Sequence, residues 1–422
     1  MHIKINNVDY AAIRDLTFTP QTDIMGNELP INEFSAEIKT DHNISVGKYA
    51  YLYGDNDDLW AKYHIVEAQR LSPRTVTVRC QSDILLLERK KLPAKMCNEA
   101  SAYSIISECF GAFNLSFSIS PELTDKTITG YLPEQTVRER LQWVCFVLGG
   151  YVKSFFSDRI QILAISDSVR YIQADRTFYR PKLQYKDYVT AVRATSYTYT
   201  QGTPSSVDTW VKDGNTYYIQ TSQQASLNNA NVPAGTPDNI IDLSGITIVN
   251  DDNISDVLTR LAAQYFNREE LTADILNEGE VKPGEKVAIY DGVSQIISGY
   301  VKSAGFKFGK SSKSTITLSQ TVSSNAVKLT ILYHYDGDII SRETYTFPAN
   351  TAYTLQNSYV DKTMQGKKRV YLPLTETTEG TTGTTASTAD VQCEVALEFS
   401  ENILDIISVD SASQSREVLT IG

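Results

Sequence analysis

The sequence predicts a mainly β protein with an α+β portion: two small antiparallel β-barrels, an intervening α/β region and a C-terminal small β domain. Three observations lead to this expectation. The chain has 25 tyrosines and many threonines, serines and valines, which are residue types that favour strands. Several short runs alternate apolar and polar residues, as half-buried strands do. A pattern of roughly 45–50 residues also occurs twice along the chain.

Length and composition exclude several classes of protein. At about 150 residues per domain, the 422 residues correspond to two to four domains. Hydrophobic residues make up 41% and charged residues 21%, which fits neither a disordered nor a membrane protein. The formal net charge of −11 argues against a dedicated nucleic-acid binder, so we expect no sequence-specific nucleic-acid partner. We also expect no secretory signal and no membrane insertion, because no long apolar run is present.

The two copies of the repeat share apolar positions and a glycine at the same spacing. Eight residues define them: Phe34, Ala36, Ile38 and Gly47 in the first copy, and Leu271, Ala273, Ile275 and Gly284 in the second. Any two β meanders share period-2 patterning, but the equal glycine spacing favours a duplication. Each copy is expected to form a small antiparallel barrel. Two similar barrels in one chain can occupy equivalent places around a ring.

Further segments extend the match between the copies. We align residues 49–51 with 287–289, which inserts one residue in the second copy. We then align residues 63–66 with 298–301, and the closing run 75–78 with 315–318.

Three helices are predicted, over residues 101–110, 136–148 and 253–270. In the second of them, Thr136 followed by Glu139 has the spacing of a capping box. The pair Gly149 and Gly150 marks the end of that helix.

The order of the elements predicts four domains. They are a first β-barrel domain at 1–90, an α+β domain at 91–185, a second β-barrel domain at 186–325 and a C-terminal β accessory domain at 326–422. The second barrel domain carries the helix 253–270 and an exposed insertion at 205–236, in which Asp213 and Gly214 form a hairpin turn.

The C-terminal domain opens on a strand and a turn at Asp336 and Gly337. We expect the Thr-rich segment 375–389 to be a loop or linker. Two interpretations of this domain remain open, packing within a particle or binding to a glycan or partner fibre.

A search for catalytic, cofactor and metal motifs returns none. The four histidines do not pair at metal-ligand spacing, and the run of acidic residues at 55–58 is expected to be a hairpin tip. Five widely spaced cysteines are expected to be free thiols: Cys80, Cys97, Cys109, Cys145 and Cys393. We therefore predict a protein that is not an enzyme and needs no cofactor.

In four segments, 34–83, 130–151, 258–275 and 281–301, the order and spacing of elements resemble the baseplate hub proteins of contractile phage tails and related contractile injection systems, including phage-tail-like bacteriocins. The resemblance covers about residues 1–325 and carries no catalytic signature.

This resemblance implies a structural role. It implies a homotrimer with pseudo-sixfold symmetry that joins the tail tube protein to the central spike protein and contacts other baseplate proteins. The location would be the baseplate of a virion or tail-like particle, assembled in the cytoplasm of a bacterial host. Two alternatives stay open at this stage. One is a receptor- or glycan-binding tail protein, and the other is a tail-associated peptidoglycan hydrolase.

Overall fold

The structure is a computed structural model, and it describes most of the chain. It covers residues 1–335 apart from 12, 173–175, 179, 278–279, 291–294 and 309–311. Beyond these it describes the backbone of segments 338–348, 351–355, 359–361, 368–371, 374–378, 388–391, 396–399 and 403–409.

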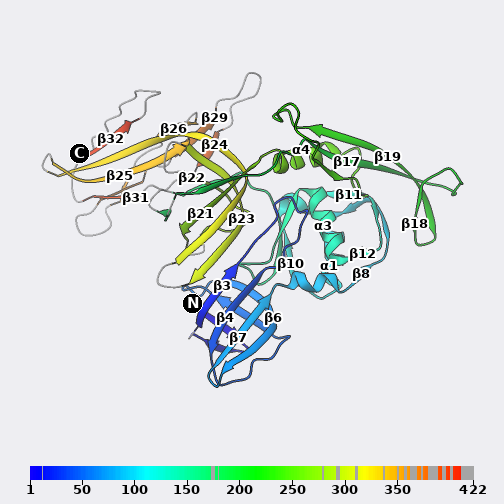
Figure 1. Cartoon of the computed structure of the whole chain (residues 1–422), viewed down its shortest axis with the longest axis horizontal. Helices are drawn as coiled ribbons and strands as arrows, with labels where there is room; N and C mark the ends of the chain where they lie inside the picture. The colour runs from blue at the N-terminus through cyan, green and yellow to red at the C-terminus, as the bar shows by residue number, and fades with distance from the viewer. Residues whose placement is uncertain are drawn as a thin grey trace.

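The N-terminal part is an antiparallel sheet, here called the first β unit (blue in Figure 1). Its strand order is β3-β4-β7-β6-β5-β1-β2. Burial alternates along β4 and β7, so one face of the sheet packs into the core and the other faces solvent. Its strands are β1 (His2–Ile5), β2 (Val8–Tyr10), β3 (Ile13–Thr19), β4 (Glu33–Lys39), β5 (Tyr49–Tyr53), β6 (Leu59–Ser72) and β7 (Thr75–Gln81).

A second β unit repeats this strand order as β16-β21-β24-β23-β22-β15. Its strands are β15 (Val169–Ile172), β16 (Lys182–Tyr185), β21 (Glu269–Leu276), β22 (Lys286–Tyr290), β23 (Gln295–Phe308) and β24 (Ser312–Tyr335). The prediction of an antiparallel barrel is wrong for one strand of this unit, because β15 runs parallel to β22.

The two β units are parts of one continuous sheet. Strand β3 pairs with β4 on one side and with β23 of the second unit on the other. Their inward faces also form a single hydrophobic cluster, which runs from Ile3 to Leu318. A mainly β protein with a smaller helical portion is thus confirmed, with the two β units fused edge to edge rather than standing apart.

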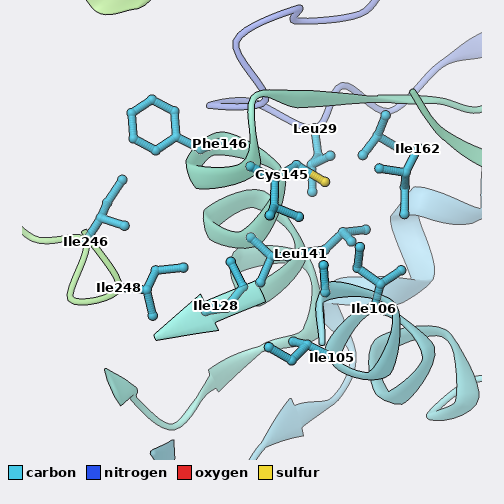
Figure 2. Packing of buried hydrophobic residues seen from close by; sticks show 14 of the residues in the cluster. Leu29, Ile105, Ile106, Ile128, Leu141, Cys145, Phe146, Ile162, Ile246 and Ile248 are labelled. Atoms are coloured by element: carbon cyan, nitrogen blue, oxygen red, sulfur yellow. The ribbon is translucent and has the colours of Figure 1, made fainter. Parts of the chain in front are cut away.

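The helical region lies beside the β units and has its own core (Figure 1). Its elements before residue 165 are η1 (Asp83–Glu88), β8 (Lys91–Leu92), β9 (Lys95–Ser101), α1 (Ala102–Gly111), β10 (Phe117–Ile119), α2 (Pro121–Thr124), β11 (Thr127–Leu132), β12 (Gln135–Thr136), α3 (Val137–Leu148), β13 (Gly150–Lys153) and β14 (Ile160–Ala164). Side chains from α1, α3 and β11 meet in this core, among them Ile106, Leu141 and Ile128 (Figure 2).

Helix α3 begins and ends as the sequence predicts. The Thr136 side chain accepts a hydrogen bond from the Glu139 N–H, and the Glu139 carboxylate accepts one from the Thr136 N–H, which completes the capping box. Gly149 ends the helix in the left-handed conformation at φ 74°.

The segment between residues 189 and 262 packs on the helical region rather than on the second β unit. It contains β17 (Ala191–Gln201), β18 (Trp210–Asp213), β19 (Thr216–Asn228), β20 (Ile240–Leu243) and α4 (Ile254–Tyr265). Val192, Ile248 and Leu261 belong to the core that α1 and α3 form, and Figure 2 shows Ile246 and Ile248 beside α3. The structure therefore differs from the predicted domain 186–325, whose residues divide between two cores.

Two predicted features of this segment have clear outcomes. The hairpin with its turn at Asp213 and Gly214 is present as β18 and β19, and it projects from the molecule (Figure 1). The helix predicted to reach residue 270 is wrong at its end. It stops at Tyr265, because Glu269 and Glu270 already pair in β21 with Tyr185 and Gln184 of β16.

The C-terminal strands also depart from the predicted boundary. Strand β24 runs through residue 326 without a break and continues to Tyr335, so the C-terminal strands extend the second β unit. It pairs there with β25 (Asp338–Pro348) and β32 (Ile403–Val409). The predicted turn at Asp336 and Gly337 lies outside the described residues.

The remaining C-terminal strands are β26 (Thr351–Leu355), β27 (Tyr359–Asp361), β28 (Lys368–Tyr371), β29 (Leu374–Thr378), β30 (Thr388–Val391) and β31 (Ala396–Phe399). The expectation of a loop over 375–389 is wrong at both ends, since β29 and β30 pair with each other.

Candidate functional site

The residues predicted to define the repeat lie at matching places in the two β units. Phe34, Ala36 and Ile38 are buried on β4, and Leu271, Ala273 and Ile275 are buried on β21. Each set contributes alternate residues to the inner face of its strand. Strands β4 and β21 are therefore counterparts.

The hydrogen-bonded ladders extend this correspondence across the units. Phe34 pairs with Cys80, and Cys80 pairs in turn with Ile65. Leu271 pairs with Leu318, which pairs in turn with Val301. Cys80 and Leu318 are thus equivalent positions, and so are Ile65 and Val301.

This register corrects the alignment made from sequence in its later segments. The predicted match of 75–78 with 315–318 is wrong by two residues, since Val78 and Ile316 oppose the equivalent residues Ala36 and Ala273. The match of 63–66 with 298–301 is wrong by one residue. Period-2 patterning hides the slip of two residues, because a shift of two residues preserves the inward face.

The two repeat glycines make the same backbone contact. Gly47 has φ +83° and its N–H donates to Ile65 O, while Gly284 has φ +92° and its N–H donates to Val301 O. Tyr49 and Lys286 each follow two residues later as the first residues of β5 and β22. The one-residue insertion predicted here is therefore absent.

A β-bulge occurs at the same place in both units. The β6–β7 register shifts between Ile65 and Glu67, and the β23–β24 register shifts between Val301 and Ser303. Both β6 and β23 are 14 residues long. Bulges set the local bend and twist of a strand, so the two units bend at equivalent points.

The two β units meet at a joint between β3 and β23. Phe306 pairs with Phe18, the Ala304 N–H donates to Pro20 O at 3.0 Å, and the Thr22 N–H donates to Lys302 O at 2.9 Å. This backbone ladder holds the units edge to edge.

Aromatic side chains fill the space beneath the joint. Phe18 stacks on Phe306 with ring centroids 5.9 Å apart, and Trp60 lies 4.9 Å from Phe306. Phe156, from the segment after β13, contacts the same three rings. Such aromatic pairs add about 0.5–1.5 kcal/mol each beyond the area they bury.

The sequence alone does not predict this aromatic cluster. Phe18 and Phe306 each occur in an alternating run, which indicates burial but not the partner. Nearly three hundred residues separate them in the chain, so only the fold brings them together.

Charged groups cluster where the helical region contacts the second β unit. Burial lowers the pKa of Lys153 to about 8, with the positive charge of Lys282 acting in the same direction and the charge of Glu285 opposing it. Nearby, Asp167 accepts hydrogen bonds from Tyr300 Oη at 2.7 Å and Lys286 Nζ at 3.0 Å, and these bonds lower the pKa of Asp167. Charged and polar side chains therefore lie at the edge of the contact between the helical region and the second β unit.

The described residues offer no group of three or more side chains that could hold a metal ion. Cys80, Cys97, Cys109 and Cys145 are free and buried, as expected, and Cys393 lies outside the described residues. Burial raises the pKa of the Cys109 thiol to about 12, so this group is a poor nucleophile. Among the helices described, none is long and apolar enough to cross a membrane.

No family model and no curated protein matches the sequence. Solved structures do share the fold. The tail protein from Neisseria meningitidis MC58 aligns with a TM-score of 0.57 at 9% identity, over 75% of this chain and 95% of that one. The prophage MuSo2 43 kDa tail protein from Shewanella oneidensis aligns with a TM-score of 0.52 at 8% identity, over 75% and 96%. The prophage tail protein gp18 from Listeria monocytogenes EGD-e gives 0.51 at 10%, over 76% and 94%.

All three similar structures are tail proteins, and at this identity the likeness concerns the fold alone. The chain therefore shares the fold of these tail proteins, two of which are prophage proteins. This is the fold that the resemblance to baseplate hub proteins predicts.

Proposed function

We propose that this chain is a structural baseplate hub that forms a trimeric, pseudo-sixfold ring joining the tail tube to the central spike of a contractile tail or injection particle. The observation that supports it most is the repetition of strand order, register and bulge in the two β units. Three chains with two equivalent units each would present six similar faces. A ring of that kind can match a sixfold partner on one side and a threefold partner on the other.

The proposed partners are the tail tube protein, the central spike protein and other baseplate proteins, and the proposed location is the baseplate of a particle assembled in the bacterial cytoplasm. The tail-protein fold of the similar structures supports this location. The proposed role is structural rather than enzymatic. Incubation with purified peptidoglycan tests this part, and release of soluble fragments would contradict it.

Electron microscopy of the purified full chain, alone and mixed with the central spike protein of the same particle, tests the ring. We expect particles with threefold symmetry and six similar densities on one face. Particles of one chain under both conditions would contradict the proposal.

A further inference from the structure

The strand β3, which forms the joint, has a counterpart in the second β unit. Phe18 pairs with Phe34 on β4, and Leu183 pairs with Leu271 on β21. Because Phe34 and Leu271 are equivalent, β16 takes the place of β3. The correspondence continues upstream, where Ile13 pairs with Ile38 and Thr177 bridges to Ile275.

The two counterparts differ in what covers their outer edge. Strand β3 pairs with β23 across the joint, whereas β16 ends the strand order of the sheet and has β21 as its neighbour. Phe18 and Pro20 are buried in the joint. In the equivalent places, Leu183 is half-buried and the Tyr185 side chain is 63% exposed.

The acceptor strand β23 has its counterpart in β6, which is also open. The β5–β6 pairing ends at His64, so the part of β6 beyond Ile65 lies past the end of β5. In β23 the corresponding residues pair with β3, and Ala304 and Phe306 are buried there. In β6, Arg70 and Leu71 are exposed.

We propose that these two open edges pair between chains, so that β16 of one copy adds to the distal half of β6 of a second copy in the register of the β3–β23 joint. This inference rests on the proposed ring and names the surfaces that close it. The occupant is a second copy because the chain already contains the same contact between its own two units.

The register of the internal joint fixes the pairs expected between copies. In the internal joint, Gln21 lies opposite Ser303. The equivalent residues are Lys186 and Glu67, so these two should lie opposite each other between copies. The hydrogen bond from Ala304 to Pro20 maps to one from the Ala68 N–H to Tyr185 O. Both Lys186 and Glu67 are exposed. Lys186 already forms an ion pair with Glu270 of its own chain, and Glu67 of the second copy would add a second carboxylate of opposite charge across the strands.

The backbone of β16 has the polarity that this pairing needs. The Lys186 N–H donates to Arg268 O, and therefore points toward the strand already paired. In an antiparallel ladder the direction alternates from residue to residue, so the backbone groups of Tyr185 and Asp187 point to the open edge. Pro20 and Thr22 are their counterparts at the internal joint, and they make the hydrogen bonds to β23.

The contact is head-to-tail, because it joins the second unit of one copy to the first unit of the next. A head-to-tail contact closes into a ring when each step rotates by a fraction of a full turn. If the internal and the intermolecular joint each rotate by one sixth of a turn, six units close the ring and three chains form it.

An engineered disulfide tests the pairing directly. Gln21 and Ser303 lie directly opposite each other but exchange no backbone hydrogen bonds. In antiparallel sheets this kind of pair has the closer Cα atoms. We therefore expect the variant Glu67→Cys with Lys186→Cys to form intermolecular disulfides on mild oxidation and to run as a covalent trimer on a non-reducing gel. Glu67→Cys alone is one control.

A mispaired variant is the second control. Glu67→Cys with Lys182→Cys shifts the thiol by four residues, about 13 Å along a strand, which is beyond the reach of a disulfide. Equal cross-linking of the matched and mispaired variants would overturn the register and the inference.

Light scattering on the reduced variants separates this inference from the proposed function. A trimer that does not cross-link in the matched variant would overturn the edge pairing and leave the ring standing. A monomer that does not cross-link would overturn both. A trimer that cross-links only in the matched variant supports both.

A charge exchange gives an independent measurement on the same pair. Glu67→Lys alone should weaken association several-fold, and adding Lys186→Glu should restore part of it, since the new carboxylate also lies beside Glu270 of its own chain. Equal association of all three proteins would contradict the predicted contact between these side chains.

Discussion

The two repeat glycines show how one residue type can serve the same backbone contact in different surroundings. Both adopt positive φ, and both donate to the second strand that follows, β6 for Gly47 and β23 for Gly284. A Cβ at Gly47 would meet nothing within 4 Å, whereas a Cβ at Gly284 would lie 2.6 Å from the ring of Tyr151 on β13. Only the second glycine therefore also lets the helical region approach closely.

Alanine at these two positions should have unequal effects. The positive φ strains both variants by about 1–2 kcal/mol. Gly284→Ala should lose about 1–3 kcal/mol more, because its methyl group would overpack against Tyr151. Urea unfolding of both variants measures the difference, and equal midpoints would contradict the close contact.

Lys153 should make stability depend on pH above neutrality. Its pKa in the folded protein is about 8, below the ordinary value of 10.5. Between these two values the unfolded chain binds a proton that the folded protein does not, so stability rises as pH rises from about 8 toward 10.5.

The variant Lys153→Met should remove this rise and gain stability below pH 8, by as much as about 3 kcal/mol. Unfolding by urea across the pH range gives the two profiles. Parallel profiles for the wild type and the variant would show that Lys153 does not titrate in this way.

At the scale of elements, local signals in the sequence were sufficient for helix starts and hairpins. Thr136 and Glu139 indicate the start of α3, and Asp213 and Gly214 indicate a turn, because a few adjacent residues determine each feature. The end of α4 was mispredicted because tertiary pairing decides it. Glu269 and Glu270 suit a helix, but they pair with Tyr185 and Gln184 of β16 in a sheet.

The caps of α1 and α3 offer a matched pair of substitutions. Thr136→Ala should lower the free energy of unfolding by about 1 kcal/mol, because it removes the hydroxyl that accepts a hydrogen bond from the Glu139 N–H and leaves only the backbone half of the capping box. Ser101→Ala should change it by less than about 0.5 kcal/mol, since Ser101 makes no capping hydrogen bond through its side chain. Equal losses in the two variants would mean that the α3 cap adds nothing.

At the scale of the whole molecule, two cores divide the chain. One runs through both β units, and the other joins α1 and α3 to the segment after residue 189. The sequence predicts the repetition of the β units, because their inward residues recur at equal spacing. It does not predict the joint at Phe18 and Phe306, nor the core to which residues 189–262 belong, because both depend on contacts between distant parts of the chain.

A cavity at the joint should therefore weaken both β units together. Phe306→Ala should cost about 3–5 kcal/mol and speed amide hydrogen exchange in β5 and β22 alike. Phe110→Ala, a matched deletion in the other core, should instead speed exchange in α1 and α3. Faster exchange in only one β unit after Phe306→Ala would contradict a shared core.

The central claim is that two equivalent β units per chain build a ring of three chains. The most direct test is the native mass of the full chain by light scattering on a size-exclusion column, alone and with the spike protein. We predict three times the 47.1 kDa of one chain for the chain alone, or three such chains plus the bound spike protein in the mixture. A stable monomer that does not associate with the spike protein would contradict the account.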